Sequence, residues 1–369
     1  MLAAVFSFLS AIGIAYTLAA ALVAGRWRAP APPLPTDPPA VTLLKPLHGA
    51  EPRLAENLAG FAAQDYPAPV QIVCGVADDG DPALAAARAI GADIVIDATR
   101  HGANAKVSNL INMAARARHP LIVLSDSDMA VAPDYLARIA DAMARPGVGA
   151  VTCLYAGRGD AGGWSRLAAA GISWQFLPSV MIGLACRMAR PCMGSTIALT
   201  SDTLARIGGF RRFADLLADD HAIGAAVRAL GLEVAVPPMI LAHGCDEPSL
   251  AAIVRHELRW QATVRMLDPA GYAGSAVTHV LPFALLAGMA GGGWGWLGGA
   301  LLARLALAAR IDTIVGARTA PLWWLPARDM LSFGLYCAAF FTRRVDWRGA
   351  RLHMAHDGRM TADVETRDP

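Results

Sequence analysis

Residues 121–129 read LIVLSDSDM, an unbroken apolar run that ends in two carboxylates one residue apart. Such a run is typical of a strand buried on both faces of a sheet. The carboxylates that follow it, Asp126 and Asp128, allow two interpretations. They form a solvated turn, in which aspartate is common, or a metal site, because a D-x-D turn directs both carboxylates to one side. The rest of the sequence has to discriminate between the two.

Further apolar runs read VTLL at 41–44, VQIVCGV at 70–76 and DIVIDA at 93–98. Amphipathic stretches of helix length lie between these runs: RLAENLAGFAAQ at 53–64, DPALAAARAI at 81–90 and VSNLINMAARAR at 107–118. Strands that alternate with helices predict an α/β fold with a mostly parallel sheet. Ligands of such sheets bind at the carboxyl ends of the strands, which is where Asp126 and Asp128 would lie.

The composition indicates a protein associated with a membrane. Of the 369 residues, 55% are hydrophobic and only 17% are charged, which is too apolar for an ordinary soluble domain. The net charge of +2 gives no reason to expect nucleic acid as a partner. The six cysteines include no C-x-x-C pair. We therefore expect buried free thiols rather than a zinc site or a disulfide framework.

The first 24 residues carry no charged side chain and are long enough to cross a bilayer. A signal peptide is the alternative, but no basic segment precedes the apolar run, whereas Arg26 and Arg28 follow it. The positive-inside rule then predicts a transmembrane anchor over residues 1–25 with the following domain in the cytoplasm. A proline-rich linker over 26–40 separates this anchor from the α/β domain, which we place at 41–270.

The sequence becomes membrane-like again over residues 275–342. Two near-spanning runs, 275–290 and 294–309, precede a third at 322–341 that Arg328 and Asp329 interrupt. Several C-terminal transmembrane helices are expected here. Arginines after Phe341 favour a cytoplasmic tail over 343–369, namely Arg343, Arg344, Arg348 and Arg351.

Two features of the membrane topology stay open. Three full C-terminal spans would place the tail outside, so two spans plus a re-entrant or interfacial segment fit the charges better. Residues 164–188 are also apolar and aromatic but only weakly periodic. They form core, an interfacial helix, or the wall of a cavity that faces lipid.

Two further acidic groups accompany the D-x-D pair. Asp78, Asp79 and Asp81 follow the run at 70–76, and Asp219 and Asp220 open the segment DDHAIGAAVRAL. Each group alone is explained by the preference of aspartate for turns and helix N-caps. Three acidic groups near the carboxyl ends of parallel strands, where ligands bind, instead indicate a ligand-binding site. In contrast, His243, Cys245 and Asp246 lie in one short stretch without a second ligand pair, which is weak evidence for a metal.

A basic and aromatic segment reads RHELRW at 255–260. On a helix, His256 and Arg259 lie three residues apart and share a face. Arg259 could then bind a diphosphate through its forked guanidinium group, with Trp260 stacked on a substrate. The alternative is an ordinary amphipathic helix with Trp260 packed in the core.

Sugar transfer from a nucleotide diphosphate would need all of these groups. A divalent cation, Mg²⁺ or Mn²⁺, takes oxygen ligands and bridges carboxylates to a diphosphate. It would stabilise the charge that builds on the leaving nucleotide. A separate carboxylate would remove the proton of the acceptor hydroxyl as the general base.

The order of VADDGDPA, DSD, LADDH and HELRW resembles the D, D-x-D, D, (Q/R)xxRW series of membrane-bound GT-A glycosyltransferases. More narrowly, it is similar to the ceramide glucosyltransferase family. The likeness covers residues 41–267 and the membrane anchors, and it includes LLKPLHGAEPRLAENLAGFAAQDYP at 43–67 and HGANAKVSNLINM at 101–113. Within that family, KPLHGAEP and KVSNLINM look most like the bacterial branch associated with hopanoid biosynthesis. The likeness implies a GT-A domain, which is Rossmann-like.

The resemblance also implies roles for individual residues. His256 stands where the family usually has Gln or Arg, which leaves Arg255 as a substitute. The implied roles are nucleotide contact for Asp78, a cation near the phosphates for Lys106, the nucleotide–metal site for Asp126 and Asp128, the base for Asp220, and the RW pair for Arg259 and Trp260.

The implied reaction is an inverting transfer of a sugar, N-acetylglucosamine, from a UDP-sugar to a hopanoid polyol. It would take place in the inner membrane of a bacterium, with the catalytic domain in the cytoplasm and the lipid bilayer as a partner. Three alternatives stay open. They are glucosyl transfer to ceramide or another lipid, a processive polysaccharide synthase, and a membrane scaffold without activity.

Overall fold

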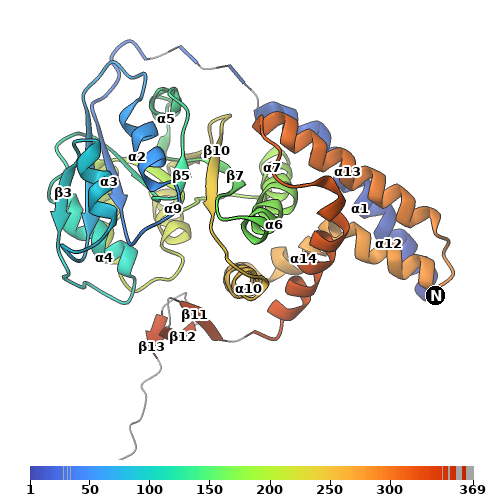
Figure 1. Ribbon diagram of the computed structural model, residues 1–369. Coiled ribbons are helices and arrows are strands. Elements are labelled where there is room, and N and C mark those ends of the chain that lie inside the picture. Colours follow the sequence, from blue (N-terminus) through green and yellow to red (C-terminus); the bar gives the residue numbers. More distant parts are fainter. Residues whose placement is uncertain are drawn as a thin grey trace, which may run out of the picture.

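The computed structural model describes residues 1–27, 29–30, 32–33, 35–342, 344–347, 350–354 and 360–362. Figure 1 shows a layered α/β part joined to a group of long helices. The α/β part begins at β1 (Val41–Pro46), directly after the proline-rich segment.

The main sheet has the strand order β3-β2-β1-β4-β8-β6-β9. Neighbours among the first four strands in this order are parallel, whereas β8 runs antiparallel to both β4 and β6. The sheet is therefore mixed, and the reversed β8 was not predicted. The strand bounds are β2 Val70–Val76, β3 Asp93–Ile96, β4 Leu121–Ser125, β6 Val148–Thr152, β8 Thr196–Thr200 and β9 Glu233–Ala235.

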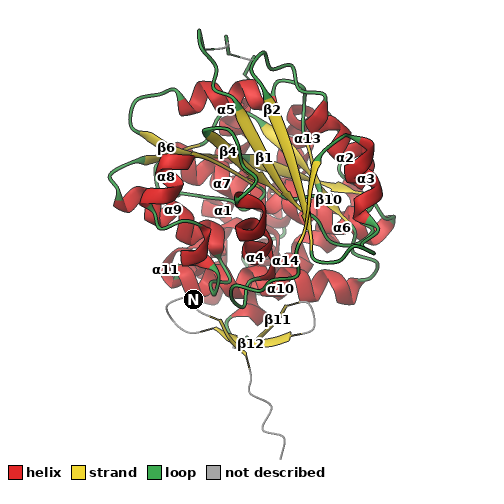
Figure 2. Ribbon diagram, turned by 90° about the vertical axis from the view of Figure 1, so that its left-hand side faces the viewer, coloured by secondary structure: helices red, strands yellow, loops and turns green. Residues whose placement is uncertain are grey.

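Helices cover both faces of this sheet, as Figure 2 shows. Successive residues of β1 illustrate why: Leu43 packs into one apolar cluster with helix α5, and Leu44 into another with helices α4 and α9. This alternation follows from the two-residue period of a strand. The helices of this part are α2 Leu54–Ala62, α3 Ala83–Ala89, α4 Ala105–Ala114, α5 Tyr135–Met143, α8 Ser201–Arg206 and α9 Asp219–Ala229.

A small second sheet has the order β5-β10-β7. It consists of β5 (Met129–Ala130), β10 (Ile240–Cys245) and β7 (Leu154–Gly159). In its register, His243 of β10 lies opposite Met129 of β5. The sequence analysis did not predict this sheet, and its pairing brings β10 beside the D-x-D turn.

The helical part is built around α1 (Leu2–Ala24), which packs against α12 (Val280–Met289) and α13 (Gly295–Val315). Gly13 allows a close approach, because a Cβ at this position would lie 2.8 Å from the Val280 side chain. The helix α6 (Gly163–Gly171) continues through a π-helical turn at Ile172–Phe176 into α7 (Leu177–Ala185). This continuous helix contains most of residues 164–188, for which the sequence allowed a core segment, an interfacial helix or a cavity wall.

By length and composition, two helices among the described residues could cross a membrane, Leu2–Trp27 and Gly163–Ala185. A bent pair, Pro269–Thr278 with Val280–Met289, adds a broken span or a re-entrant segment. The expected C-terminal spans that follow this pair are not among the helices that are long and apolar enough to cross a membrane. The physical reason is charge and length. Helix α13 carries Arg304, Arg310 and Asp312, and α14 is short (Leu325–Ala339).

The charged groups of these C-terminal helices are paired inside the protein. Both Nε and Nη2 of Arg304 lie 2.7 Å from the Asp329 carboxylate, and both residues are buried. Buried pairing of this kind is how charged groups are accommodated between helices in an apolar setting.

The remaining segments complete the fold. The helices α10 (Leu250–Leu267) and α11 (Pro269–Gly274) link the small sheet to the helical part, and the chain continues into strands β11 Arg344–Trp347, β12 Ala350–Met354 and β13 Met360–Ala362. Three arginines that served as topological markers, Arg28, Arg343 and Arg348, lie outside the described residues.

Candidate active site

The D-x-D turn lies between the last residue of β4, Ser125, and the first residue of β5, Met129. Strand β4 is central in the main sheet, so the turn stands at the carboxyl end of the sheet, where the alternation of strands and helices had placed it. The Asp126 side chain is about one third exposed, so its carboxylate remains accessible to a ligand.

Lys106 joins this turn from helix α4. Its Nζ lies 2.5 Å from Oδ1 of Asp126 and donates a hydrogen bond to the backbone oxygen of Gly194 at 3.1 Å. Burial opposes the charged form, but Asp126 and Asp219 outweigh it and raise the pKa of Lys106. Lys106 is therefore a positively charged group in direct contact with the D-x-D turn.

The acidic pair at the start of α9, Asp219 and Asp220, also lies near Lys106. Oδ2 of Asp220 accepts a hydrogen bond from the Gly194 amide at 2.8 Å, and Oδ1 accepts one from the His221 amide at 2.7 Å. A Cβ on Gly194 would lie 3.2 Å from the Asp220 carboxylate and 3.3 Å from Nζ of Lys106. Lys106 and Asp220 therefore converge on the same glycine.

Both carboxyls of this pair have a raised pKa. Burial raises the pKa of Asp219 to about 6, and burial also raises the pKa of Asp220. Oδ1 of Asp219 accepts a hydrogen bond from Asn104 at 3.2 Å, whereas its buried Oδ2 has no hydrogen-bond partner among the described residues. A carboxylate with a raised pKa is better suited to accept a proton near neutral pH.

His243 reaches the D-x-D turn from strand β10. Its Nε2 lies 3.4 Å from Oδ2 of Asp128, and its ring stacks on Tyr155. In the sequence it stood out only with Cys245 and Asp246, as a weak metal group. The pairing of β10 with β5 gives it a different neighbour, and only knowledge of that pairing could have revealed it.

The residues of the turn fit a divalent cation. Oδ1 of Asp128 is buried without a hydrogen-bond partner among the described residues, and burial raises the pKa of this carboxyl. Carboxylate oxygens are suitable ligands for Mg²⁺ or Mn²⁺. No group of three or more His, Cys, Asp or Glu side chains in the described part of the chain is arranged to hold a metal. A cation at Asp126 and Asp128 would thus complete its shell with diphosphate and water, as Mg²⁺ commonly does.

Helix α10 carries the RW segment and approaches the turn through His243. The ring of Trp260 lies 6.2 Å from that of His243 in an edge-on arrangement and 4.3 Å from that of His256. Trp260 also packs against Ile253 and Cys245. Trp260 therefore contributes to a core, as the second interpretation expects, and its stacking on a substrate stays a prediction. Arg259, the preceding residue, is half-buried.

The residue that departs from the family pattern has a structural partner. Nδ1 of His256 lies 2.6 Å from Oε1 of Glu247. Burial would raise the pKa of Glu247, but the hydrogen bond with His256 reverses this effect and lowers it. His256 thus stabilises a buried carboxylate, whereas the proposed substitute, Arg255, is exposed.

Asp78 lies in an exposed turn after β2, where its Oδ1 accepts a hydrogen bond from the Gly80 amide at 2.6 Å. Strand β2 is parallel to β1, which is parallel to β4, so the turn lies at the same edge of the sheet as Asp126. The described residues show no contact between Asp78 and the D-x-D turn, and its nucleotide contact stays a prediction.

The sequence analysis missed two ionisable groups beside the turn. Lys45, a fully buried residue of β1, donates from Nζ to the backbone oxygen of Asp126 at 2.5 Å. Burial lowers the pKa of Lys45 to about 8 and raises that of Glu51 to about 7. A signal did exist: lysine occurs at positions 45 and 106 and nowhere else in this arginine-rich sequence. Both lysines contact Asp126.

Comparisons with known proteins identify the family of this chain. The profile of glycosyl transferase family 21 matches residues 5–360. Ceramide glucosyltransferase 1 of Caenorhabditis elegans is 25% identical over 210 residues, which cover 54% of this chain and 44% of that protein. A ceramide glucosyltransferase of Gibberella zeae is 31% identical over 132 residues, which cover 30% of this chain and 25% of that protein. The match therefore spans less than half the length of either relative.

A solved structure shares the fold. The mannosyltransferase PcManGT from Pyrobaculum calidifontis, solved in complex with GDP-Man and Mn²⁺, has a TM-score of 0.52 at 21% identity. The match covers 92% of this chain and 98% of that one. The expected GT-A-like fold is thereby confirmed.

Proposed function

This chain belongs to glycosyl transferase family 21, and we propose that it transfers a sugar from a UDP-sugar to a hydroxyl group of a membrane lipid. The family is one of glycosyl transferases, and the fold is shared with a mannosyltransferase, which supports this activity. The observation that carries the proposal further is the contact between Lys106 and Asp126, together with the shared approach of Lys106 and Asp220 to Gly194. The proposal is supported by the proximity of the D-x-D turn, the ammonium group of Lys106 and the Asp220 carboxyl, whose pKa is raised by burial.

In the proposed reaction, Asp220 accepts the proton of the acceptor hydroxyl. The acceptor oxygen forms a bond to the anomeric carbon of the sugar while the bond from that carbon to the diphosphate breaks. UDP leaves with the electron pair, and the configuration inverts. Lys106 stabilises the negative charge that develops on the diphosphate, as preorganised charges do in acyl and phosphoryl transfer. Arg259 and Trp260 bind the sugar donor, and Asp78 contacts its nucleotide.

A divalent cation, Mg²⁺ or Mn²⁺, at Asp126 and Asp128 would act as a Lewis acid on the diphosphate. The unpartnered oxygen of Asp128 supports this assignment. The solved mannosyltransferase of similar fold contains Mn²⁺. His243 contacts Asp128 and would orient its carboxylate toward the cation.

The apolar helices support a membrane location for the acceptor. We place a transmembrane anchor at 1–25, a linker at 26–40, a catalytic domain at 41–270, membrane helices at 275–342 and a tail at 343–369. The catalytic domain and the tail would lie in the cytoplasm, at the inner membrane of a bacterium. Exposed apolar side chains along α1 support the anchor, among them Leu2, Val5, Phe8, Leu18 and Leu22.

The proposed acceptor is a hopanoid polyol and the proposed sugar is N-acetylglucosamine. The support for both is the resemblance of the segments at 45–52 and 106–113 to the hopanoid-associated branch. A second candidate, glucosyl transfer to ceramide, is favoured by the names of the two curated relatives.

The test uses membranes that contain the protein, incubated with UDP-N-acetylglucosamine or UDP-glucose. Each sugar donor is paired with a hopanoid polyol, ceramide or diacylglycerol, and mass spectrometry identifies the lipid products. We expect an N-acetylhexosaminyl hopanoid. Hexosylceramide as the sole product would refute the hopanoid acceptor and keep the transferase. No product from any pair would refute the proposed function.

A further inference from the structure

Three successive backbone carbonyls of the D-x-D turn are each held by a different element. The oxygen of Asp126 accepts a hydrogen bond from Nζ of Lys45 at the end of β1 (2.5 Å). The oxygen of Ser127 accepts one from Nδ2 of Asn57 on α2 (3.2 Å), and that of Asp128 accepts one from the Gly244 amide on β10 (2.8 Å). The peptide planes of the turn are therefore fixed from three sides.

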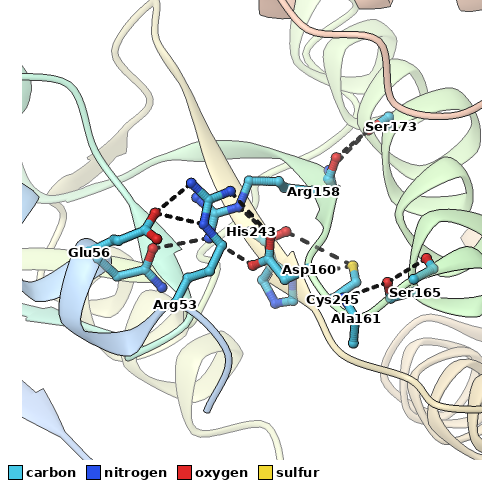
Figure 3. A network of polar contacts seen from close by, with 12 residues as sticks. Arg53, Glu56, Arg158, Asp160, Ala161, Ser165, Ser173, His243 and Cys245 are labelled. Atoms are coloured by element: carbon cyan, nitrogen blue, oxygen red, sulfur yellow. Dashed lines mark hydrogen bonds and ion pairs between the residues drawn. The ribbon is translucent and has the colours of Figure 1, made fainter.

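The Asn57 side chain makes hydrogen bonds through both polar atoms of its amide group, since Nδ2 donates to Ser127 and Oδ1 accepts from another residue. It is 2% exposed, and its Oδ1 accepts a hydrogen bond from Nη2 of Arg158 at 3.0 Å. Arg158 in turn is paired with Asp160 through Nε (2.7 Å) and Nη2 (2.8 Å). Figure 3 shows this arginine and carboxylate together with Arg53, whose Nη1 lies 3.7 Å from Asp160.

The same network returns to the turn through strand β10. The Asp160 amide donates to the oxygen of Cys245 at 2.9 Å. A Cβ on Gly244 would lie 2.7 Å from Oδ2 of Asp160 and 3.1 Å from the oxygen of Asp128. Glycine is required here because the Asp160 carboxylate and the Asp128 backbone approach from two sides. The contacts therefore form a closed path from Ser127 through Asn57, Arg158, Asp160 and β10 back to Asp128.

We propose that Asn57 is a positioning residue for the transfer reaction, acting through the Ser127 carbonyl to orient the carboxylates of Asp126 and Asp128. Rotation of the 126–128 peptides would redirect both carboxylates at once, because their Cβ atoms are attached to the same short turn. Misplacement by about 1 Å can lower a reaction rate by about 10²-fold. The planar amide of Asn57 fixes the Ser127 carbonyl against Arg158, whose own position is set by Asp160. The inference rests on the proposed function for its effect on catalysis, but its effect on the turn can be tested independently.

The experiment compares Asn57→Asp and Asn57→Ala with the wild-type chain in lipid nanodiscs. Asn57→Asp keeps the shape and the oxygen that faces Arg158, but it removes the N–H that Ser127 requires. Asn57→Ala removes the same N–H without adding a charge. The matched control is Gln64→Glu. It removes an amide donor just after helix α2 that bonds the backbone oxygens of Gly60 and Ala132, and the described residues show no hydrogen bond from it to the turn.

The first readout is hydrogen–deuterium exchange of peptides that cover residues 125–130, with the strand at 196–200 as the internal reference. We expect exchange of the turn to rise about fivefold in both Asn57 variants, the change that corresponds to the loss of one ordinary hydrogen bond. Exchange of the reference strand should stay the same, as should the turn in Gln64→Glu. This readout needs no substrate. Unchanged exchange at the turn in both variants, or an equal rise across the whole chain, would overturn the proposal.

The second readout is transfer kinetics. Groups that orient ligating carboxylates typically contribute 10- to 100-fold, so kcat/KM for the UDP-sugar should fall roughly 10- to 100-fold while KM for the lipid acceptor stays constant. A loss confined to the acceptor KM, or none, contradicts the positioning role. A wild-type chain without transferase activity would refute the proposed function, and the exchange measurement would still decide the role of Asn57 in the turn.

Discussion

Nζ of Lys106, near the start of α4, lies 2.5 Å from Oδ1 of Asp126, just beyond the end of β4. The contact joins a helix on one face of the sheet to the D-x-D turn at its carboxyl edge. Through Gly194 the same ammonium group approaches Asp220. The groups assigned to the leaving diphosphate and to the acceptor hydroxyl are therefore neighbours, and substitutions at each should have distinguishable effects.

Lys106→Met should lower kcat for sugar transfer by about 10²-fold, because the loss of one preorganised charge at a developing anion typically has this effect. Lys106→Arg should retain part of the activity, since it keeps the positive charge. Steady-state transfer assays with varied UDP-sugar measure both. Arg116→Gln, an exposed change just after the same helix, is the control. Wild-type kcat in Lys106→Met would show that the lysine serves only to pair with Asp126.

Asp220→Asn should lower kcat by about 10²- to 10⁴-fold, the range for removal of a general base. The asparagine side chain can still accept the hydrogen bond from the Gly194 amide, so the KM for the UDP-sugar should change little. The exposed change Asp202→Asn on α8 is the control, because that carboxylate lies away from the site. Full activity in Asp220→Asn would exclude this residue as the base and would direct attention to Asp219.

The sequence allowed the fold around the candidate site to be predicted more completely than the contacts within it. The strand that ends at Ser125 and the helices around it follow from local hydrophobic patterns, which is why an α/β fold could be predicted. The GT-A assignment came from the resemblance of the acidic and RW motifs to a known family. Contacts such as His243 with Asp128, or Asn57 with Ser127, depend on the pairing of β10 with β5 and on the packing of α2. These are long-range arrangements without a local signal.

The C-terminal helices illustrate a second limit of sequence patterns. Apolar runs predicted several transmembrane spans there. Hydropathy does not show that Arg304 forms an ion pair with Asp329, or that Arg328 forms one with Glu257 on α10 at 2.6 Å. These pairs let charged residues lie inside a helical assembly. A count of apolar residues alone therefore overestimates the number of simple transmembrane helices in this region.

Asp219→Asn should stabilise the protein at neutral pH. Burial raises the pKa of Asp219 from 3.8 to about 6 in the folded state, so between these two pH values the folded state binds more protons than the unfolded state. The stabilisation from the protonated form is complete below pH 3.8 and is lost as the pH rises through about 6.

The melting temperature of Asp219→Asn relative to the wild type should therefore increase as the pH is raised from about 5 to 7.5. Differential scanning fluorimetry of detergent-solubilised protein across this range is the measurement. Asp202→Asn, at an exposed site, should show a difference that does not vary with pH. A difference for Asp219→Asn that shrinks toward neutral pH would contradict the raised pKa.

Gly171→Ala should destabilise the chain by about 1–3 kcal/mol, the usual effect of overpacking. A Cβ at Gly171 would lie 1.8 Å from Nη2 of Arg328, which is paired with Glu257 on the helix that carries Trp260. Gly163→Ala, at the start of the same α6, is the matched control, because its nearest neighbour would be a Trp324 ring carbon at 3.8 Å. Thermal unfolding measures both, and equal melting temperatures would mean that Arg328 moves aside freely.

Removal of divalent cations with a chelator should abolish transfer, and Mn²⁺ or Mg²⁺ should restore it. The structural reason is the D-x-D turn, where a buried oxygen of Asp128 lacks a hydrogen-bond partner. His243→Ala should raise the Mn²⁺ concentration needed for half-maximal activity by roughly 10- to 100-fold, because it removes the ring 3.4 Å from the other Asp128 oxygen. His101→Ala, at a histidine whose ring instead contacts Asn112, should leave the Mn²⁺ requirement unchanged. Full activity after exhaustive chelation would remove the metal from the proposed mechanism and leave Lys45 and Lys106 as the cations that face Asp126.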